Sequence, residues 1–279
     1  MLTAGVLTAL MRATHPEPAV AVTAASGLLA LAFGHPPGSA VLVTATVGAS
    51  QLAVGWANDA VDADRDRAAG RRDKPVATGA VSRRTVAVAA VAAAATTVLF
   101  GYLAGAAAGT VVTVGLVSAL AYNWPLKRTA LSVVPYTVSF AALPAYVVLA
   151  LPGRPPAWLL VAAGLLGAGA HFANVLPDLA DDAATGVRGL PHRLGHRGSA
   201  ASAAVLLLAA AAVLVTGPPG PPTGWAVAAL GAAVVILPAG WYAGRSAIAA
   251  GRRPTALFRA FLLITIVIVG LLLAGGTRL

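Results

Sequence analysis

The sequence predicts an all-α protein that crosses a membrane many times, and three observations favour this fold class. Apolar runs of about twenty residues, the length that spans about 30 Å of hydrocarbon, recur almost from end to end. Hydrophobic side chains make up 58% of the 279 residues and charged ones only 10%, and the mean hydropathy is +0.83. Because a soluble domain carries about a quarter charged residues, we expect a single transmembrane domain over residues 1–279.

A window of about 19 residues predicts nine transmembrane helices. The predicted spans are residues 18–34, 38–57, 85–105, 108–123, 131–151, 156–175, 199–216, 224–243 and 257–275. Three connections, at 35–38, 152–156 and 217–222, are rich in Pro and Gly, which end helices and favour turns. All three fall on the same side of the predicted bilayer.

The positive charges predict the orientation of these spans. Of the 19 Lys and Arg residues, only Arg154 and Arg278 fall on the side of the Pro-rich connections. The positive-inside rule therefore places the N-terminus and the basic loops in the cytoplasm and the C-terminus outside. Arg greatly outnumbers Lys, as is typical of GC-rich bacterial genomes, so we expect a multi-pass protein of a bacterial plasma membrane.

Charge and cysteine content exclude several kinds of function. The net charge of +10 does not indicate a nucleic-acid partner, because the cations lie in loops between apolar segments and form no solvated basic face. The chain has no cysteine, which excludes disulfides, a thiol nucleophile and a Cys-ligated metal site.

The acidic residues are concentrated in two places. Eight of the nine are Asp residues that follow the second and sixth predicted spans, and only Glu17 stands apart. If these acids served only to make cytoplasmic loops soluble, the other cytoplasmic loops would carry acids too, and they do not. The first cluster contains Asp59, Asp62, Asp64, Asp66 and Asp73, and the second contains Asp178, Asp181 and Asp182.

The spacing within each cluster points to a metal site. Asn58, Asp62 and Asp66 follow one another at intervals of four, so a helix that continues past the membrane edge lines them along one face. Residues 178–182 repeat this pattern at intervals of three and four. Carboxylates so close together repel one another unless cations lie among them. Hard oxygen ligands without His or Cys favour Mg²⁺, and two clusters imply two half-sites that face each other.

Basic residues near the acids point to a diphosphate. A single loop cation is most often only a determinant of topology, but Arg and Lys beside Mg²⁺ carboxylates are the groups that hold a diphosphate. A diphosphate site at the mouth of a lipid-embedded bundle suggests a substrate with a polar head and a long apolar tail. These cations are Arg65, Arg67, Arg71, Arg72 and Lys74 at the first cluster, Lys127 and Arg128 in the next cytoplasmic loop, and Arg188 after the second cluster.

The two acidic segments resemble the signature motifs of the UbiA superfamily of intramembrane prenyltransferases. Residues 58–66 read NDAVDADRD and match the family's N-D-x-x-D-x-x-x-D. Residues 74–79 read KPVATG where the family commonly has R-P-L-x-S-G, and residues 178–182 read DLADD, which matches D-x-x-D or D-x-x-x-D. Where the family has Arg-Pro at the start of the first span, this chain has His15-Pro16.

This resemblance implies nine helices around a central cavity that binds two Mg²⁺ ions and a polyprenyl diphosphate. The implied activity is transfer of the prenyl group to a small acceptor, aromatic or otherwise. Asn58, Asp62 and Asp66 would hold one ion, and Asp178, Asp181 and Asp182 the other. Tyr122 and Lys127 resemble the family's Y-x-x-x-K diphosphate contact, with one extra residue between them. The aromatic residues that could face the cavity are Trp56, Tyr122, Trp124, Tyr136 and Phe172.

Two polar residues, His171 and Asn174, lie two helical turns and one helical turn, respectively, before the second cluster, at membrane depth. Polar groups inside a span are functional candidates. We hypothesise that both line the acceptor side of the cavity and that His171 orients or deprotonates an acceptor hydroxyl. The alternative is a neutral His bonded to a backbone carbonyl between helices.

Two other functions are compatible with parts of this pattern. A membrane terpene cyclase would use the same metal and diphosphate site, so the Asp motifs do not separate it from a transferase. A divalent-cation transporter would need acids along a path through the bilayer, whereas these acids lie at one face and no charged residue lies in the middle of a span.

Overall fold

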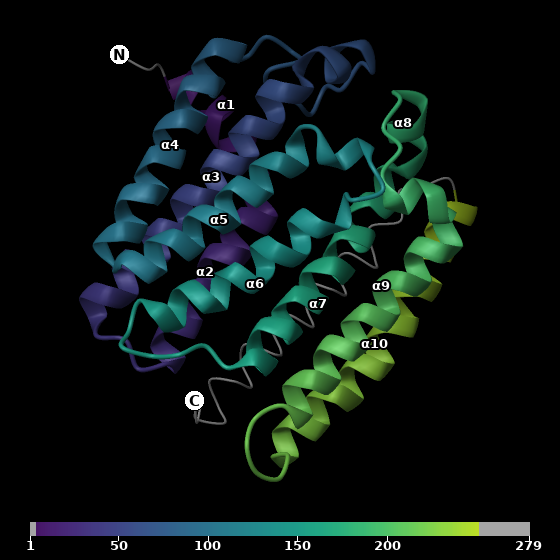
Figure 1. Cartoon of the computed structure of the whole chain (residues 1–279). Coiled ribbons are helices and arrows are strands. Elements are labelled where there is room, and N and C mark those ends of the chain that lie inside the picture. The colour runs from purple at the N-terminus through teal and green to yellow at the C-terminus, as the bar shows by residue number, and fades with distance from the viewer. Residues whose placement is uncertain (1–3, 251–279) are drawn as a thin grey trace.

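The computed structural model describes residues 4–250, without the side chains of Ala180, Asp181 and several residues of the last helix, and every regular element in that range is a helix (Figure 1). Eight of the nine predicted spans fall in this range, and each corresponds to a helix. The predicted span 257–275 lies outside the described residues, as do the expected cations Arg252, Arg253, Arg259 and Arg278. A total of nine spans therefore stays a prediction.

The helices alternate in direction along the chain (Figure 1). Two of them, α1 and α8, are short elements that the hydropathy pattern did not predict. The α-helices are α1 (Ala4–Arg12), α2 (Pro16–Ala32), α3 (Pro37–Ala68), α4 (Arg83–Leu103), α5 (Ala106–Asn123), α6 (Val133–Leu149), α7 (Ala157–Val175), α8 (Leu179–Ala184), α9 (Leu190–Thr216) and α10 (Gly224–Ala249), with 3-10 turns η1 (Leu126–Arg128) and η2 (Leu176–Asp178).

Five of these helices are long and apolar enough to cross a membrane: α3, α4, α5, α7 together with η2, and α9. Two shorter apolar helices are α2 and α6, and a third apolar stretch of that kind lies within α10. Consecutive helices pack against each other from α2 to α7, and α7 packs against α9. The α3–α4 connection and α8 therefore lie at the same end of the bundle, at the top of Figure 1.

The long helix α3 extends well beyond its apolar part, as the spacing of Asn58, Asp62 and Asp66 predicted. It runs to Ala68 and ends where Gly70 adopts a left-handed conformation with a φ of 64°. The amide of Arg71 then donates a hydrogen bond to the carbonyl of Asp66 at 3.0 Å, which caps the end of the helix. This extension carries the first Asp cluster to the end of the bundle where α8 lies.

Small residues allow the closest helix contacts in the bundle. A Cβ atom built on Gly167 of α7 would lie 2.4 Å from the carbonyl oxygen of Tyr136 in α6 and 2.6 Å from Cβ of Phe140. Such contacts replace the hydrophobic effect as the source of association between helices in lipid. Some buried polar groups are paired within the bundle, as where Tyr146 donates to the hydroxyl of Thr46 at 2.9 Å.

Gly167→Ala is expected to destabilise the fold by about 1–3 kcal/mol, because the added methyl group would have to separate α6 from α7. The measurement is the thermal melting of the detergent-purified variant. Gly38→Ala is the matched control, since a Cβ at Gly38, in the first turn of α3, meets no atom within 4 Å. Equal melting temperatures for the two variants would contradict the close crossing.

Candidate active site

The two Asp clusters meet at one point, and Arg65 joins them. Its guanidinium lies 2.9 Å from Asp62 and 3.7 Å from Asp66 within α3, and 3.5 Å from Asp182 of α8. Segments more than a hundred residues apart in sequence therefore bring their carboxylates to one cation. The sequence interpretation required this convergence at a single end of the bundle, and the structure has it.

Asp62 lies at the centre of the buried part of this site. Its side chain is 3% exposed, and both of its carboxylate oxygens contact the ammonium group of Lys127, which η1 places there at 6% exposure. Asn58 donates to Asp62 at 3.2 Å and to the side-chain oxygen of Asn123 at 3.3 Å. Burial lowers the pKa of Lys127, and the charge of Asp62 opposes that shift.

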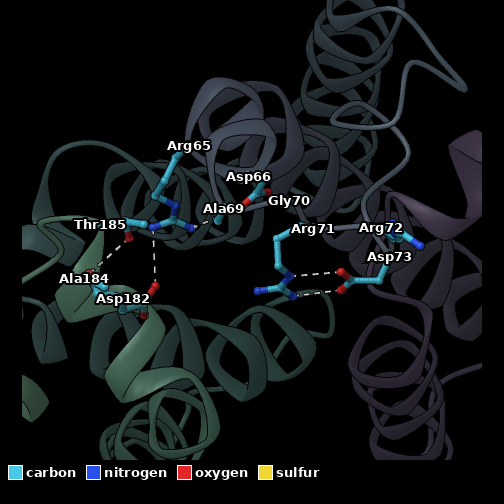
Figure 2. A pocket seen from close by; sticks show the side chains of 10 residues that line it. All are labelled: Arg65, Asp66, Ala69, Gly70, Arg71, Arg72, Asp73, Asp182, Ala184 and Thr185. Atoms are coloured by element: carbon cyan, nitrogen blue, oxygen red, sulfur yellow. Dashed lines mark hydrogen bonds and ion pairs between the residues drawn. The ribbon is translucent and has the colours of Figure 1, made fainter.

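A cleft of about 600 Å³ opens beside Arg65 (Figure 2). On its far side from Arg65, Arg71 is fixed by two parallel hydrogen bonds to Asp73, at 2.9 and 2.8 Å. This pairing holds the pKa of Asp73 well below its usual value. The cleft is lined by Arg65, Asp66, Ala69, Gly70, Arg71, Arg72, Asp73, Asp182, Ala184 and Thr185.

Asp178 and Asp182 stand on the α8 side of the site. Burial raises the pKa of Asp182. The bond to Asp73 raises the pKa of Arg71, burial opposes that rise, and the charges of Asp178 and Asp66 add to it. The cleft therefore has acidic and basic groups on the side of α3 and the loop after it, and the acidic Asp182 on the α8 side. The side chain of Asp181 lies outside the described part of the structure.

Lys74 is held at the back of the first cluster. Its ammonium group donates to Asp59 at 2.8 Å and lies 2.9 Å from Nε2 of His15. Trp56 donates to the carbonyl of Leu10 at 2.9 Å and so fixes α1 against the same part of α3. Lys74 thus links the turn between α1 and α2, which contains His15, to the loop that carries Arg71.

His15 is expected to make the stability of the fold depend on pH. Partial burial, and then the charge of Lys74, lower the pKa of His15 from 6.5 to about 4. The unfolded chain therefore binds a proton at His15 more readily than the folded chain does. The stability that the neutral His15 provides is complete above pH about 6.5 and is lost as the pH falls towards 4. We expect melting temperatures to drop less between pH 7.5 and pH 5 in His15→Gln than in the wild type. Equal drops would contradict the shifted pKa.

His171 lies in a buried group of aromatic rings. Its ring centroid is 5.5 Å from that of Tyr122 and 5.1 Å from that of Tyr136. Nε2 of His171 lies 3.0 Å from the hydroxyl of Ser132, which also accepts the amide hydrogen of Leu190 at 2.9 Å. The partner of this His is therefore a hydroxyl group, where the alternative interpretation expected a backbone carbonyl.

Asn174 donates to the phenol oxygen of Tyr136 at 3.1 Å, so both polar residues of α7 contact the aromatic group. Their role towards an acceptor stays a prediction.

Several sequence candidates do not join the cleft. Arg67 pairs with Asp64 at 2.9 Å on an exposed face of α3, where Arg83 also contacts Asp64. Arg128, Arg188 and Trp124 are exposed and do not line the cleft. Phe172 is buried in the packing between α7 and α9. The roles predicted for these residues are not tested by their positions.

The sequence interpretation gave some residues of the site no individual role. Arg65 was noted only as one cation among many, although its position three residues after Asp62 allows a helical ion pair. Asn123, beside Tyr122 at the end of a span, has the polarity that marks functional positions in membrane helices. His192 lies 4.0 Å from Asp182, and neither of its ring nitrogens has a hydrogen-bond partner among the described residues.

The oxygen ligands that the Asp side chains offer are suited to Mg²⁺. The carboxylates of Asp62, Asp66 and Asp182 surround one guanidinium, which shows that the site stabilises positive charge between its two walls. Among the side chains that the structure describes, which do not include Asp181, no three acidic or His side chains converge closely enough to hold an ion by themselves. Mg²⁺ does not require this, since it takes one or two carboxylates, several waters and phosphate oxygens.

Comparison with known proteins identifies related folds. The fold is similar to solved structures of a digeranylgeranylglyceryl phosphate synthase (15% identity over 98% of this chain and 99% of that one, TM-score 0.70), a UbiA homolog from Aeropyrum pernix K1 (21% identity, 93% and 98%, 0.69) and a UbiA homolog from Archaeoglobus fulgidus bound to GPP and Mg²⁺ (15% identity, 95% and 98%, 0.72). No curated protein matches the sequence significantly.

A model of the UbiA prenyltransferase family matches residues 19–264, which include both Asp motifs and Lys127. The match covers most of the 279 residues. The chain therefore belongs to the UbiA prenyltransferase family.

Proposed function

We propose that this protein is an intramembrane prenyltransferase that uses Mg²⁺ to transfer a prenyl group from an isoprenoid diphosphate to a small acceptor, aromatic or otherwise. The observation that carries the proposal is the convergence of the two Asp motifs on Arg65, beside a cleft lined by further Arg residues. Family membership supports it, as does the similarity in fold to homologs bound to GPP and Mg²⁺ or to DMAPP and Mg²⁺.

The residues fall into two sets, one for each of two expected ions. Asn58, Asp62 and Asp66 would hold one ion, and Asp178, Asp181 and Asp182 the other. Bound Mg²⁺ would supply Lewis-acid stabilisation of the charge that develops on the leaving diphosphate. The cations predicted to contact the diphosphate are Arg67, Arg71, Arg72, Lys74, Lys127, Arg128 and Arg188, of which Arg71 and Arg72 line the cleft and Lys127 contacts Asp62.

The aromatic group provides the apolar side of the reaction. Tyr122, Tyr136 and Phe140 form successive ring contacts with centroids 5.0 and 6.1 Å apart. Aromatic faces stabilise a cation, and their apolar surfaces exclude the water that would capture it. His171 and Asn174 adjoin this group and would orient the acceptor.

The location follows from the same proposal. The cleft lies among the basic loops that the positive-inside rule assigns to the cytoplasm. We therefore expect the prenyl diphosphate to enter from the cytoplasmic face of a bacterial plasma membrane, with its tail directed towards the lipid.

The test is mass spectrometry of products formed by the purified protein from a panel of prenyl diphosphates, with Mg²⁺ and a membrane extract as the source of acceptor. Transfer predicts a prenylated acceptor that disappears when EDTA removes the metal. A second incubation with geranylgeranyl diphosphate alone separates the alternatives, because recovered substrate indicates a transferase and a cyclic hydrocarbon or alcohol a terpene cyclase. Intact substrate in every incubation would refute both.

A further inference from the structure

Arg65 differs from every other cation near the site. Among the described residues, it is the one side chain that forms ion pairs with both Asp clusters, and it also lines the cleft. Lys127 contacts Asp62 alone and is nearly inaccessible, whereas the Arg65 side chain is 21% exposed. Arg65 therefore combines the carboxylate contacts of the buried site with access to the open cleft.

We propose that Arg65 is an exchangeable counterion that neutralises the two Asp clusters before metal binds and moves to the diphosphate when metal ions take over the carboxylates. This inference rests on the proposed function and adds an order of binding to it. It assigns Arg65 two successive partners, the first a pair of carboxylate groups and the second a diphosphate oxygen.

Charge makes the two arrangements mutually exclusive. An Asp62 oxygen that lies 2.9 Å from a guanidinium nitrogen cannot also bind a divalent ion without repulsion between the two cations, and Lys127, which contacts the same carboxylate, adds to that repulsion. Arg65 must leave that oxygen, and its departure is favourable only where another anion can receive it. Guanidinium groups pair well with phosphate through parallel hydrogen bonds, and the cleft beside Arg65 has room for such a group.

The consequence is a linkage between metal and diphosphate. Without diphosphate, a metal ion has to displace Arg65 from Asp62, Asp66 and Asp182, so metal binding is weak. With diphosphate present, Arg65 gains a new partner and the metal affinity rises. By reciprocity, the metal raises the affinity for diphosphate by the same factor.

The experiment measures Mn²⁺ binding by electron paramagnetic resonance, with and without inorganic pyrophosphate, on the detergent-purified full chain. In the wild type we expect pyrophosphate to tighten Mn²⁺ binding at least about tenfold, within the usual range of coupled sites. Arg65→Gln removes the guanidinium charge shared by the two clusters and leaves Lys127 on Asp62, so Mn²⁺ alone should bind at least about tenfold more tightly and pyrophosphate should add less. Arg65→Lys, which keeps the charge, should resemble the wild type.

Arg83→Gln is the matched control, because Arg83 is a 54% exposed arginine at the start of α4 that pairs with the exposed Asp64 and is not among the cations assigned to the diphosphate. It should leave both affinities unchanged. Unchanged Mn²⁺ affinity of Arg65→Gln in the absence of pyrophosphate would overturn the counterion role. So would a wild-type Mn²⁺ affinity that pyrophosphate does not alter, which needs no variant. If the wild type binds no pyrophosphate at any Mn²⁺ concentration, the proposed function itself fails, and this inference with it.

Discussion

Replacing Asp62 with Asn is expected to lower kcat/KM for prenyl transfer by about a hundredfold to a thousandfold, the usual effect of removing one preorganised electrostatic group. The substitution preserves the size of the side chain but removes the negative charge. That charge is contacted by Lys127 and Arg65, and the Asp62 side chain is only 3% exposed. The measurement is the rate of product formation at saturating Mg²⁺.

Asp64→Asn is the control for this prediction. Asp64 lies two residues further along α3, with its side chain 73% exposed, and pairs only with Arg67 and Arg83 on the surface. It should leave kcat/KM within a factor of about two, since surface ion pairs contribute little. A comparable loss of activity in both variants would mean that Asp62 acts only through the general charge of α3.

Replacing Lys127 with Met is expected to destabilise the metal-free protein by about 3 kcal/mol and to abolish most of its activity. The side chain fills the same space, but the buried Asp62 loses the cation that contacts both of its oxygens. Breaking one partner of a buried ion pair leaves an uncompensated charge, and here Arg65 and Asn58 offset only part of it. Thermal melting in detergent measures the first effect and turnover the second.

Arg128→Met provides the comparison, because Arg128 is the next residue along η1 and is exposed. It should melt close to the wild type. If Lys127→Met melts at the temperature of Arg128→Met, the ion pair with Asp62 does not stabilise the fold. If Lys127→Met retains full turnover, Lys127 is not a diphosphate contact.

The sequence predicts the features of this structure that depend on local periodicity. The apolar runs place eight helices correctly within residues 4–250, and the four-residue spacing of Asn58, Asp62 and Asp66 predicts that α3 continues beyond its apolar part. The motifs also predict that residues 58–66 and 178–182 share one site. Helix geometry fixes the first two features, and the need for two ligand sets around one substrate fixes the third.

Local sequence patterns do not predict the contacts between segments that are far apart in the chain. Nothing in the local pattern indicates that His171 meets Ser132, 39 residues earlier, or that Lys74 binds Asp59 and His15. The start of α9 at Leu190, with a break at Gly195, also differs from the predicted start at residue 199, because polar residues precede its apolar part. The distant contacts depend on how the helices cross, which the sequence of each helix does not specify.

The most direct test of the central claim is a diffraction experiment on the protein crystallised with Mn²⁺ and a non-hydrolysable prenyl diphosphate analogue. The anomalous signal of Mn²⁺ locates the metal without reference to any activity. We predict manganese peaks within ligand distance of Asp62 or Asp66 on one side and of Asp178 or Asp182 on the other, with the diphosphate between them. Manganese bound to only one of the two Asp clusters, or a diphosphate bound away from both, would contradict the account.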